Sequence, residues 1–390
     1  MSSSAHSLEG LPAGRPPKQR RTVFSSTIVL GRVAGVEIGL NWSWLVVFGL
    51  ILWSLATVQF PAALPGRSWQ TYAAMGVTAT AIFFACLILH ELGHAIQARR
   101  EGVKIEGITL WLFGGVAKIA GEFPSAGAEF RMAAAGPLVS LILGVLFVVE
   151  AEAWPGPGGI ATELAWLGYI NLVLLAFNLV PALPLDGGRM LRAALWARSR
   201  DFAAATHRAT RVSGVLAAAI IALGLVEVLA GGLDGIWLAV VGWFILEAGR
   251  AEEMRVETRD ALAGVTVAML MTRSPVIVGA DQTLAEVADA LAGTPRHTAY
   301  PAVEDGAVIG LLPLNALAQR GGDLWSRRVR DYVVSVGQVP TFSPDMPAMA
   351  ALDELVASGT GRGVVFDEER LVGIISTTDI ARALALGRPV

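Results

Sequence analysis

Long runs of apolar residues in the first 250 positions constrain this chain more than any other feature. Six of them approach the roughly 20 residues that a helix needs to cross a bilayer core of roughly 30 Å. A mean hydropathy of +0.57, with only 16% charged residues, is too apolar for a soluble protein of ordinary composition. We therefore expect six transmembrane helices, at residues 40–58, 72–98, 130–150, 164–180, 211–231 and 234–249.

Basic residues indicate the orientation of these helices. Lys and Arg are frequent before the first run and after the second, fourth and sixth, whereas the other connections contain only Arg67. Cytosolic loops close to membrane spans are enriched in Lys and Arg. The pattern predicts a multi-pass protein of the cell membrane with both termini in the cytosol. A net charge of −3 gives no indication of a nucleic-acid partner.

Composition also divides the chain into domains, because the apolar runs end near residue 250 and the remainder has ordinary charge content. We expect a flexible cytosolic tail, rich in Ser, Pro and Gly, over residues 1–35. An α-helical polytopic membrane domain follows at 36–250, and a linker at 251–263. A soluble α/β domain made of two repeats, 264–325 and 326–390, completes the prediction.

The second apolar run contains the sequence HELGH, which matches the pattern H-E-x-x-H. On a helix, positions i and i+4 lie on one face, so His90 and His94 can bind one metal ion. Glu91 is then placed to act on a water molecule at that metal. The alternative is a pair of interfacial histidines near Arg99 and Arg100. Ionisable groups at membrane depth are costly, which favours a functional site.

A catalytic zinc ion usually has three protein ligands, so a third ligand is expected elsewhere in the chain. The other histidines lie outside the apolar runs, whereas Asp186 is the first aspartate of the sequence and follows the fourth run. Pro181 and Pro184 interrupt a helix there, and Gly187 and Gly188 relax the backbone, so we expect an irregular segment lining a cavity. The alternative for Asp186 is a solvated turn at the cytosolic surface.

These residues carry a resemblance to the site-2 protease family of intramembrane zinc metalloproteases, prokaryotic type with a C-terminal pair of CBS repeats. It rests on the HELGH motif, on LFGGVAKI at 112–119, on AAAGPLVS at 133–140 and on the Asn, Pro and Asp-Gly-Gly series between 178 and 188. The resemblance implies one Zn²⁺ per chain, held by His90, His94 and Asp186, with Glu91 as the catalytic acid and base.

The resemblance also implies two further features near the site. Asn178 is a candidate for positioning the substrate or the oxyanion, although an amide that bonds freed backbone near Pro181 is an equal alternative. Residues 107–120 are expected to form a hairpin, with Gly114 and Gly115 as its turn, onto which a substrate strand can pair.

Substrates of such an enzyme are single-span or otherwise membrane-anchored proteins, cut within or beside the bilayer in regulated intramembrane proteolysis. The backbone of a transmembrane helix is satisfied internally, so a peptide bond must be exposed by local unwinding before water attacks it. A membrane transporter or channel regulated by CBS repeats is the competing function. We prefer the protease because the intramembrane polar residues converge on one H-E-x-x-H and one Asp.

The soluble region repeats itself at a spacing of about 63 residues, with residues 299–317 parallel to 362–380. Both units resemble CBS repeats, which pair into a module that often binds an adenine nucleotide. By this resemblance Ser376, Thr377 and Asp379 are the nucleotide-contacting candidates of the second unit. The first unit departs from the pattern, with Pro313 and Ala316 at the equivalent places of Ser376 and Asp379. A structural repeat without a ligand and a homodimer through the repeats are the open alternatives.

Overall fold

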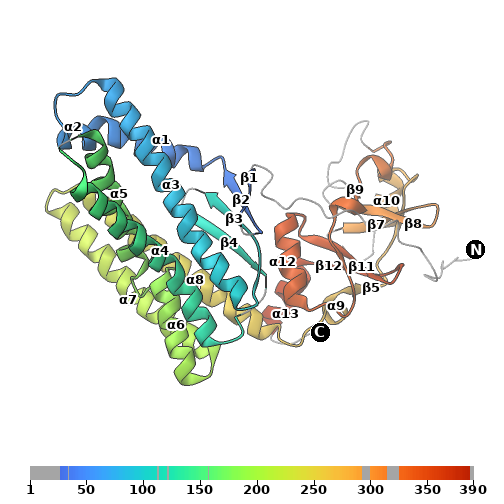
Figure 1. Cartoon of the computed structure of the whole chain (residues 1–390). Coiled ribbons are helices and arrows are strands. Elements are labelled where there is room, and N and C mark those ends of the chain that lie inside the picture. Colours follow the sequence, from blue (N-terminus) through green and yellow to red (C-terminus); the bar gives the residue numbers. More distant parts are fainter. Residues whose placement is uncertain are drawn as a thin grey trace, which may run out of the picture. The chain divides into compact units, whose positions relative to one another are not determined.

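The structure is a computed structural model of the whole chain, and it describes residues 27–386. Within that range it leaves out residues 34, 112–113, 121–122, 157, 292–298 and 314–324. The chain forms two compact units, with a boundary between Glu257 and Thr258. Both units appear in Figure 1, and each is described by itself below.

The first unit is built mainly from helices, several of which are long and apolar. The π-helical segment η1 joins the first two helices into one continuous run. Ser68, Ser125 and Asp201 cap α3, α4 and α7, because each side chain accepts a hydrogen bond from a free backbone N–H in the first turn. The helices are α1 (Trp44–Ser54), η1 (Leu55–Gln59), α2 (Phe60–Ala63), α3 (Trp69–Arg100), α4 (Ala126–Ala153), α5 (Gly159–Asn178), α6 (Asp186–Ser199), α7 (Phe202–Leu229) and α8 (Asp234–Ala261).

Five helical segments of the described chain are long and apolar enough to cross a membrane. They correspond to the first five predicted spans, each displaced by a few residues, and are Trp44–Ala63, Trp69–Arg100, Ala126–Ala153, Gly159–Asn178 and Phe202–Leu229. The sixth predicted span, 234–249, forms the first half of α8, whose second half is rich in charged residues. The helical, membrane-type domain is therefore confirmed, whereas the count of six is not.

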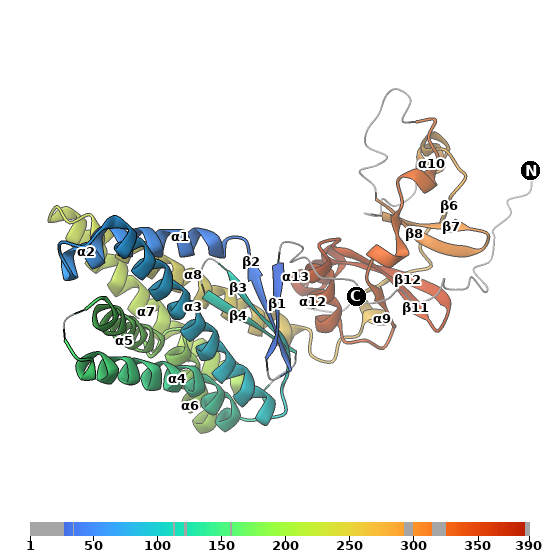
Figure 2. The ribbon, with the colours of Figure 1, turned by 45° about the horizontal axis from the view of Figure 1, so that its top comes forward.

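A four-stranded sheet accompanies the helices, in the order β1-β2-β3-β4. Neighbouring strands are antiparallel except β2 and β3, which are parallel. Figures 1 and 2 show this sheet beside α3, and both β3 and β4 contact that helix. The strands are β1 (Thr27–Val33), β2 (Val36–Asn41), β3 (Lys104–Trp111) and β4 (Gly114–Ala120).

Two predictions for this region need correction. Residues 27–33, assigned to a flexible tail, form β1 and pair with β2; residues 1–26 lie outside the described part. The hairpin at 107–120 is confirmed, but Gly114 and Gly115 are not its turn, because they pair with Trp111 and Leu110 inside the ladder. Residues 27–33, TIVLGRV, do not alternate between apolar and polar positions, so the sequence of β1 lacks the usual pattern of a half-buried strand.

The second unit contains two similar sheets, one for each repeat. One has the order β6-β7-β8-β9 and the other β10-β11-β12-β5. Equivalent strands begin about 63 residues apart, which matches the repeat seen in the sequence. Each sheet takes its last strand from outside its own repeat. The strands are β5 (Thr272–Arg273), β6 (Val278–Gly279), β7 (Ala299–Glu304), β8 (Ala307–Pro313), β9 (Val334–Ser335), β10 (Thr341–Phe342), β11 (Arg362–Asp367) and β12 (Arg370–Ser376).

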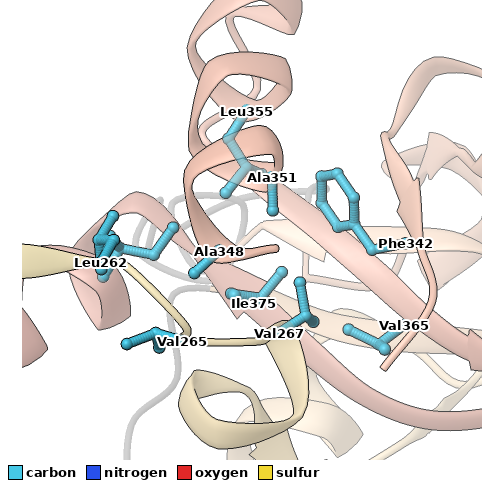
Figure 3. Packing of buried hydrophobic residues seen from close by; sticks show 10 residues of the cluster. Leu262, Val265, Val267, Phe342, Ala348, Ala351, Leu355, Val365 and Ile375 are labelled. Carbon is cyan, nitrogen blue, oxygen red and sulfur yellow. The ribbon is translucent and has the colours of Figure 1, made fainter. Parts of the chain in front are cut away.

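Short helices cover these sheets and close the apolar cores. The core of the second repeat is drawn in Figure 3, where Leu355 from α12 and Val365 from β11 pack with Val267 from α9. Val267 therefore lies in the core of the second repeat although it belongs by sequence to the first. The helices are α9 (Val267–Leu270), α10 (Leu284–Ala290), α12 (Ala348–Ser358) and α13 (Thr377–Leu386).

The predicted linker at 251–263 is largely helical, because α8 continues to Ala261. The α/β repeat domain is confirmed by its two sheets and their covering helices.

Candidate metal centre

His90 and His94 lie one turn apart on α3, and both are buried, with exposed fractions of 2% and 8%. Asp186 is the first residue of α6, nearly a hundred positions later. The structure brings all three together. Asp186 Oδ2 lies 3.3 Å from His90 Nε2 and 3.2 Å from His94 Nε2, and the two Nε2 atoms are 3.1 Å apart.

These separations match the geometry of a zinc site. Bonds of roughly 2.0–2.1 Å at tetrahedral angles place neighbouring ligand atoms roughly 3.3–3.4 Å apart. Asp186 Oδ2 is buried, and it has no hydrogen-bond partner in the described part of the chain. A buried carboxylate oxygen without a partner is costly. A cation between the three atoms would remove that cost, so the residues present fit a metal ion.

Hydrogen bonds to the outer ring nitrogens fix the orientation of both imidazoles. His94 Nδ1 lies 2.8 Å from the carbonyl oxygen of Met132, which can only accept, so Nδ1 donates and the neutral ring directs the lone pair of Nε2 toward Asp186. His90 Nδ1 lies 2.8 Å from Ser140 Oγ, a fully buried hydroxyl. Such partners hold a metal-binding histidine in one tautomer and one orientation. Both belong to α4.

Helix α4 approaches the histidines through Gly136. A Cβ atom at this position would lie only 2.1 Å from His94 Nε2 and 2.6 Å from His90 Nε2. Any side chain there would occupy the space between the rings. Helix α4 packs against both α3 and α6, as Figures 1 and 2 show, and this glycine lets the backbone of α4 form one wall of the site.

The segment before Asp186 is irregular, as predicted, but the two glycines that follow Asp186 have another role than the predicted one. Gly187 and Gly188 are in the first turn of α6 rather than in relaxed backbone. A Cβ at Gly187 would lie 2.3 Å from the carbonyl oxygen of Leu179, and one at Gly188 would lie 2.3 Å from the backbone nitrogen of Leu183. The glycines therefore allow the chain to fold back tightly, which places Asp186 at the helix start.

Glu91 follows His90 on α3 and is partly buried. Its carboxylate interacts electrostatically with both histidines, with Asp186 and with Arg189. Asn178, the last residue of α5, donates its side-chain amide to the carbonyl oxygen of Leu174, one turn back on its own helix. The structure thus groups Glu91 with the three donors, whereas the hydrogen bond of Asn178 points along α5.

The candidate nucleotide residues lie at the end of β12 and the start of α13. The backbone N–H of Ser376 and its hydroxyl both donate to Asp379 Oδ2, at 2.9 and 2.6 Å, and the backbone N–H of Asp379 donates to Ser376 Oγ. This reciprocal pair is a capping box for α13. The backbone N–H of Thr377 donates to the carbonyl oxygen of Gly361. In the first repeat, Pro313 ends β8, and Ala316 lies outside the described residues.

Sequence reasoning missed the contributions of α4. Gly136 and Ser140 lie in the AAAGPLVS segment that carried part of the family resemblance, so a signal was present without an assigned role. Arg192 was counted only as a basic residue of a cytosolic connection, yet it is 3% exposed and bonded to Glu129 and Glu252. Nothing in local sequence distinguishes a buried arginine from a solvated one.

Comparison with known proteins places this geometry in context. Peptidase family M50 matches residues 78–156 and 156–223, and the CBS domain matches residues 267–320 and 329–386. A protein of Mycobacterium tuberculosis named as a zinc metalloprotease, Rip3, is 40% identical over 368 residues, which cover 93% of each chain. Zinc metalloprotease MJ0392 of Methanocaldococcus jannaschii is 32% identical, over 78% of this chain and 84% of that protein.

Two solved structures are also similar. A site-2 protease from Methanocaldococcus jannaschii is 30% identical, with a TM-score of 0.41, and the match covers 58% of this chain and 95% of that one. The CBS domain of a bacterial CNNM/CorC family Mg²⁺ transporter, solved with ATP, is 20% identical, with a TM-score of 0.30 over 35% of this chain and 99% of that one.

Proposed function

Because the chain belongs to the site-2 protease family of zinc metalloproteases, peptidase family M50, we propose that it is an intramembrane endopeptidase whose zinc ion is held by His90, His94 and Asp186. One observation carries the proposal. Three buried electron-pair donors from two helices converge at 3.1–3.3 Å, and the carboxylate oxygen among them has no hydrogen-bond partner in the described chain. The proteases among its relatives favour this function over a transporter.

Zinc bound by two imidazoles and one carboxylate leaves a position free, where it supplies an activated water and polarises a carbonyl group. Glu91 is the residue that moves the protons. Its carboxylate accepts a proton from water as the water attacks the peptide carbonyl, and the resulting acid donates that proton to the leaving amine. The Met132 carbonyl and Ser140 keep both rings oriented throughout.

The substrate we propose is a membrane-anchored protein that is cut in or beside its transmembrane segment. The donors of the site are buried among helices α3, α4 and α6, and the unit has five helices of membrane-spanning length and composition. A substrate helix has to unwind locally to expose a peptide bond. Strand β4 is the last strand of the sheet among the described residues and contacts α3, so an unwound segment can pair with its outer edge as an added strand.

The variant Glu91→Gln tests this function. The amide cannot accept the proton from water, so cleavage of a membrane-anchored reporter should fall by about 10²–10⁴-fold, while zinc remains bound at one ion per chain. Glu101→Gln is the matched control, because Glu101 lies at the end of the same helix and pairs with Arg131 instead. Undiminished proteolysis by Glu91→Gln would disprove the mechanism.

We further propose that both termini are cytosolic and that the CBS pair regulates proteolysis by binding an adenine nucleotide near Ser376, Thr377 and Asp379. The distribution of basic residues supports the orientation. The position of these residues at the junction of β12 and α13 supports the binding site, since a helix N-terminus favours phosphate. Asn178 remains a proposed substrate-positioning residue.

Calorimetric titration of the full chain with ATP, ADP and AMP tests the nucleotide proposal. Heat of binding that is lost in Asp379→Ala would support it, and no heat with any of the three would end it. We also propose a homodimer through the CBS pair; the mass of the purified protein in solution tests it, and a single-chain mass would contradict it.

A further inference from the structure

Arg192 lies on α6, in the basic connection that follows the fourth apolar run, and it contacts two carboxylates and an aromatic ring. Its Nε atom donates to Glu129 Oε1 at 2.8 Å, its Nη1 atom donates to Glu252 Oε1 at 2.6 Å, and Nη2 also donates to Glu129. Glu129 is fully buried. The guanidinium group lies 4.9 Å from the centre of the Phe202 ring. Four helices, α4, α6, α7 and α8, therefore meet at one cation.

Stability alone is a poor explanation for this cluster. Taking charges out of water costs much of what their mutual attraction returns, and apolar side chains of similar volume often do as well. Glu129 Oε2 even lacks a hydrogen-bond partner among the described residues. A guanidinium group differs from apolar side chains in that its donors lie in one plane at fixed angles. It can therefore fix the positions of two carboxylates at once.

The two helices fixed by this group are the ones that complete the metal centre. Glu129 lies one turn before Met132 on α4, and the Met132 carbonyl accepts the hydrogen bond from His94 Nδ1. Arg192 lies on α6, whose first residue is Asp186. The Glu129–Arg192 ion pair thus joins α4 to α6 within two helical turns of both Met132 and Asp186. A shift of α6 along α4 would move Asp186 Oδ2 away from the histidines.

We propose that Arg192 is a positioning residue for zinc binding. It fixes α6 against α4 through Glu129, and against α8 through Glu252, so that Asp186 Oδ2 stays 3.2–3.3 Å from both histidine Nε2 atoms. This inference rests on the proposed zinc function of the three donors. Arg192 acts through Glu129 and Glu252 and is not itself one of the metal donors.

The variant Arg192→Lys tests the inference in the full chain. Lysine keeps the positive charge but lacks the planar fork, so the two carboxylates are no longer fixed together. Zinc affinity, measured by competition with a chelator, should fall about 10–100-fold, as for other residues that orient metal ligands. Protease activity should be low at limiting zinc and recover at saturating zinc. Arg198→Lys, an exposed position on the same helix, should leave affinity and activity unchanged.

A second variant keeps the test valid if Arg192→Lys fails to fold. Glu129→Gln combined with Arg192→Met removes the buried charges together, so no charge of this pair is left uncompensated. Its zinc affinity should fall in the same range. Unchanged zinc affinity in either folded variant, even with a lower melting temperature of the metal-free protein, would overturn the inference and leave the proposed function intact. Failure of the unaltered chain to bind zinc would overturn both.

Discussion

The metal centre of the membrane unit and the β12–α13 junction of the CBS pair differ in how their polar groups are satisfied. At the metal centre, a buried carboxylate oxygen faces two imidazole nitrogens and has no hydrogen-bond partner in the described chain. At the junction, Ser376 and Asp379 satisfy each other as a helix cap. A buried carboxylate oxygen that faces two imidazole nitrogens without a hydrogen bond is explained by a bound cation, whereas groups that satisfy each other are explained by the fold alone.

This difference shows that family resemblance and local geometry are separate kinds of evidence for a ligand-binding site. The resemblance suggested ligand-binding residues in both places. Only at the metal centre does the geometry itself call for a ligand, since the spacing of the donors fits a zinc ion. The nucleotide proposal has no comparable support, because Asp379 is already engaged by two donors of Ser376.

The largest expected effect follows from adding one methyl group to the wall of the metal centre. In Gly136→Ala, the new Cβ would fall 2.1 Å from His94 Nε2 and force the rings apart. Bound zinc should drop to less than about a tenth of an ion per chain, because the tetrahedral arrangement is lost. Metal analysis of the purified variant measures this. Gly214→Ala is the control, since a Cβ at Gly214 has 4.0 Å of space. Full zinc in Gly136→Ala would contradict the geometry of the centre.

A smaller effect is expected from removing the hydroxyl that orients His90. Ser140→Ala leaves the buried His90 Nδ1 without its partner at 2.8 Å, so the ring loses its fixed orientation. Zinc affinity should weaken about 10–100-fold. Thr80→Ala removes another buried hydroxyl of this unit, which donates to the backbone carbonyl of Gly76 on α3, and it should not change the affinity. Equal affinities in both variants would show that Ser140 does not support the site.

Gly136 and Ser140 show which features of the metal centre a single sequence does not reveal. The i and i+4 spacing of His90 and His94 is local, so a helix alone places them on one face. Asp186 could be chosen because it is the first aspartate of the chain and follows the fourth apolar run at a Pro- and Gly-containing segment. The roles of Gly136 and Ser140 depend instead on how α4 packs against α3, forty or more residues away. Such contacts have no periodic signature in a single sequence.

The same limit explains the errors. Gly187 and Gly188 were interpreted as flexible backbone, but they are helical, and what they allow is close approach to Leu179 and Leu183. The strands β1 and β2 were not predicted; β1 lacks apolar alternation, and β2 pairs in parallel with β3, which lies more than sixty residues later. The helical membrane-type region and the α/β repeat domain were predicted correctly. Their signals, the apolar runs and a repeat of about 63 residues, each extend over many positions.

At the CBS junction, a substitution should affect stability rather than metal binding. Asp379→Ala removes one side of the capping box and should lower the free energy of unfolding by about 1 kcal/mol. Zinc content and protease activity measured without nucleotide should stay at the unaltered level. Denaturant titration of the full chain, alongside metal analysis, tests both expectations. A loss of zinc in this variant would break the contrast between the two regions.

The smallest effect concerns the pH dependence of stability. Burial raises the pKa of Glu252, but the Arg192 guanidinium beside it outweighs burial and holds that pKa below its usual range. A lowered pKa in the folded state stabilises the protein above the ordinary Glu value of about 4.3, and this contribution disappears as the pH falls through the folded pKa. Melting temperatures of the metal-free protein should therefore fall on acidification below about pH 4.3, and less steeply in Glu252→Gln. Parallel curves would contradict the shift.

Metal analysis of the purified full chain, with and without Asp186→Ala, tests the central claim most directly. We predict one zinc ion per unaltered chain and loss of that ion in the variant, because the carboxylate oxygen between His90 and His94 is removed. Asp260→Ala, an exposed position on α8, should keep its zinc. Retention of a full zinc ion by Asp186→Ala would show that the three residues do not share one metal.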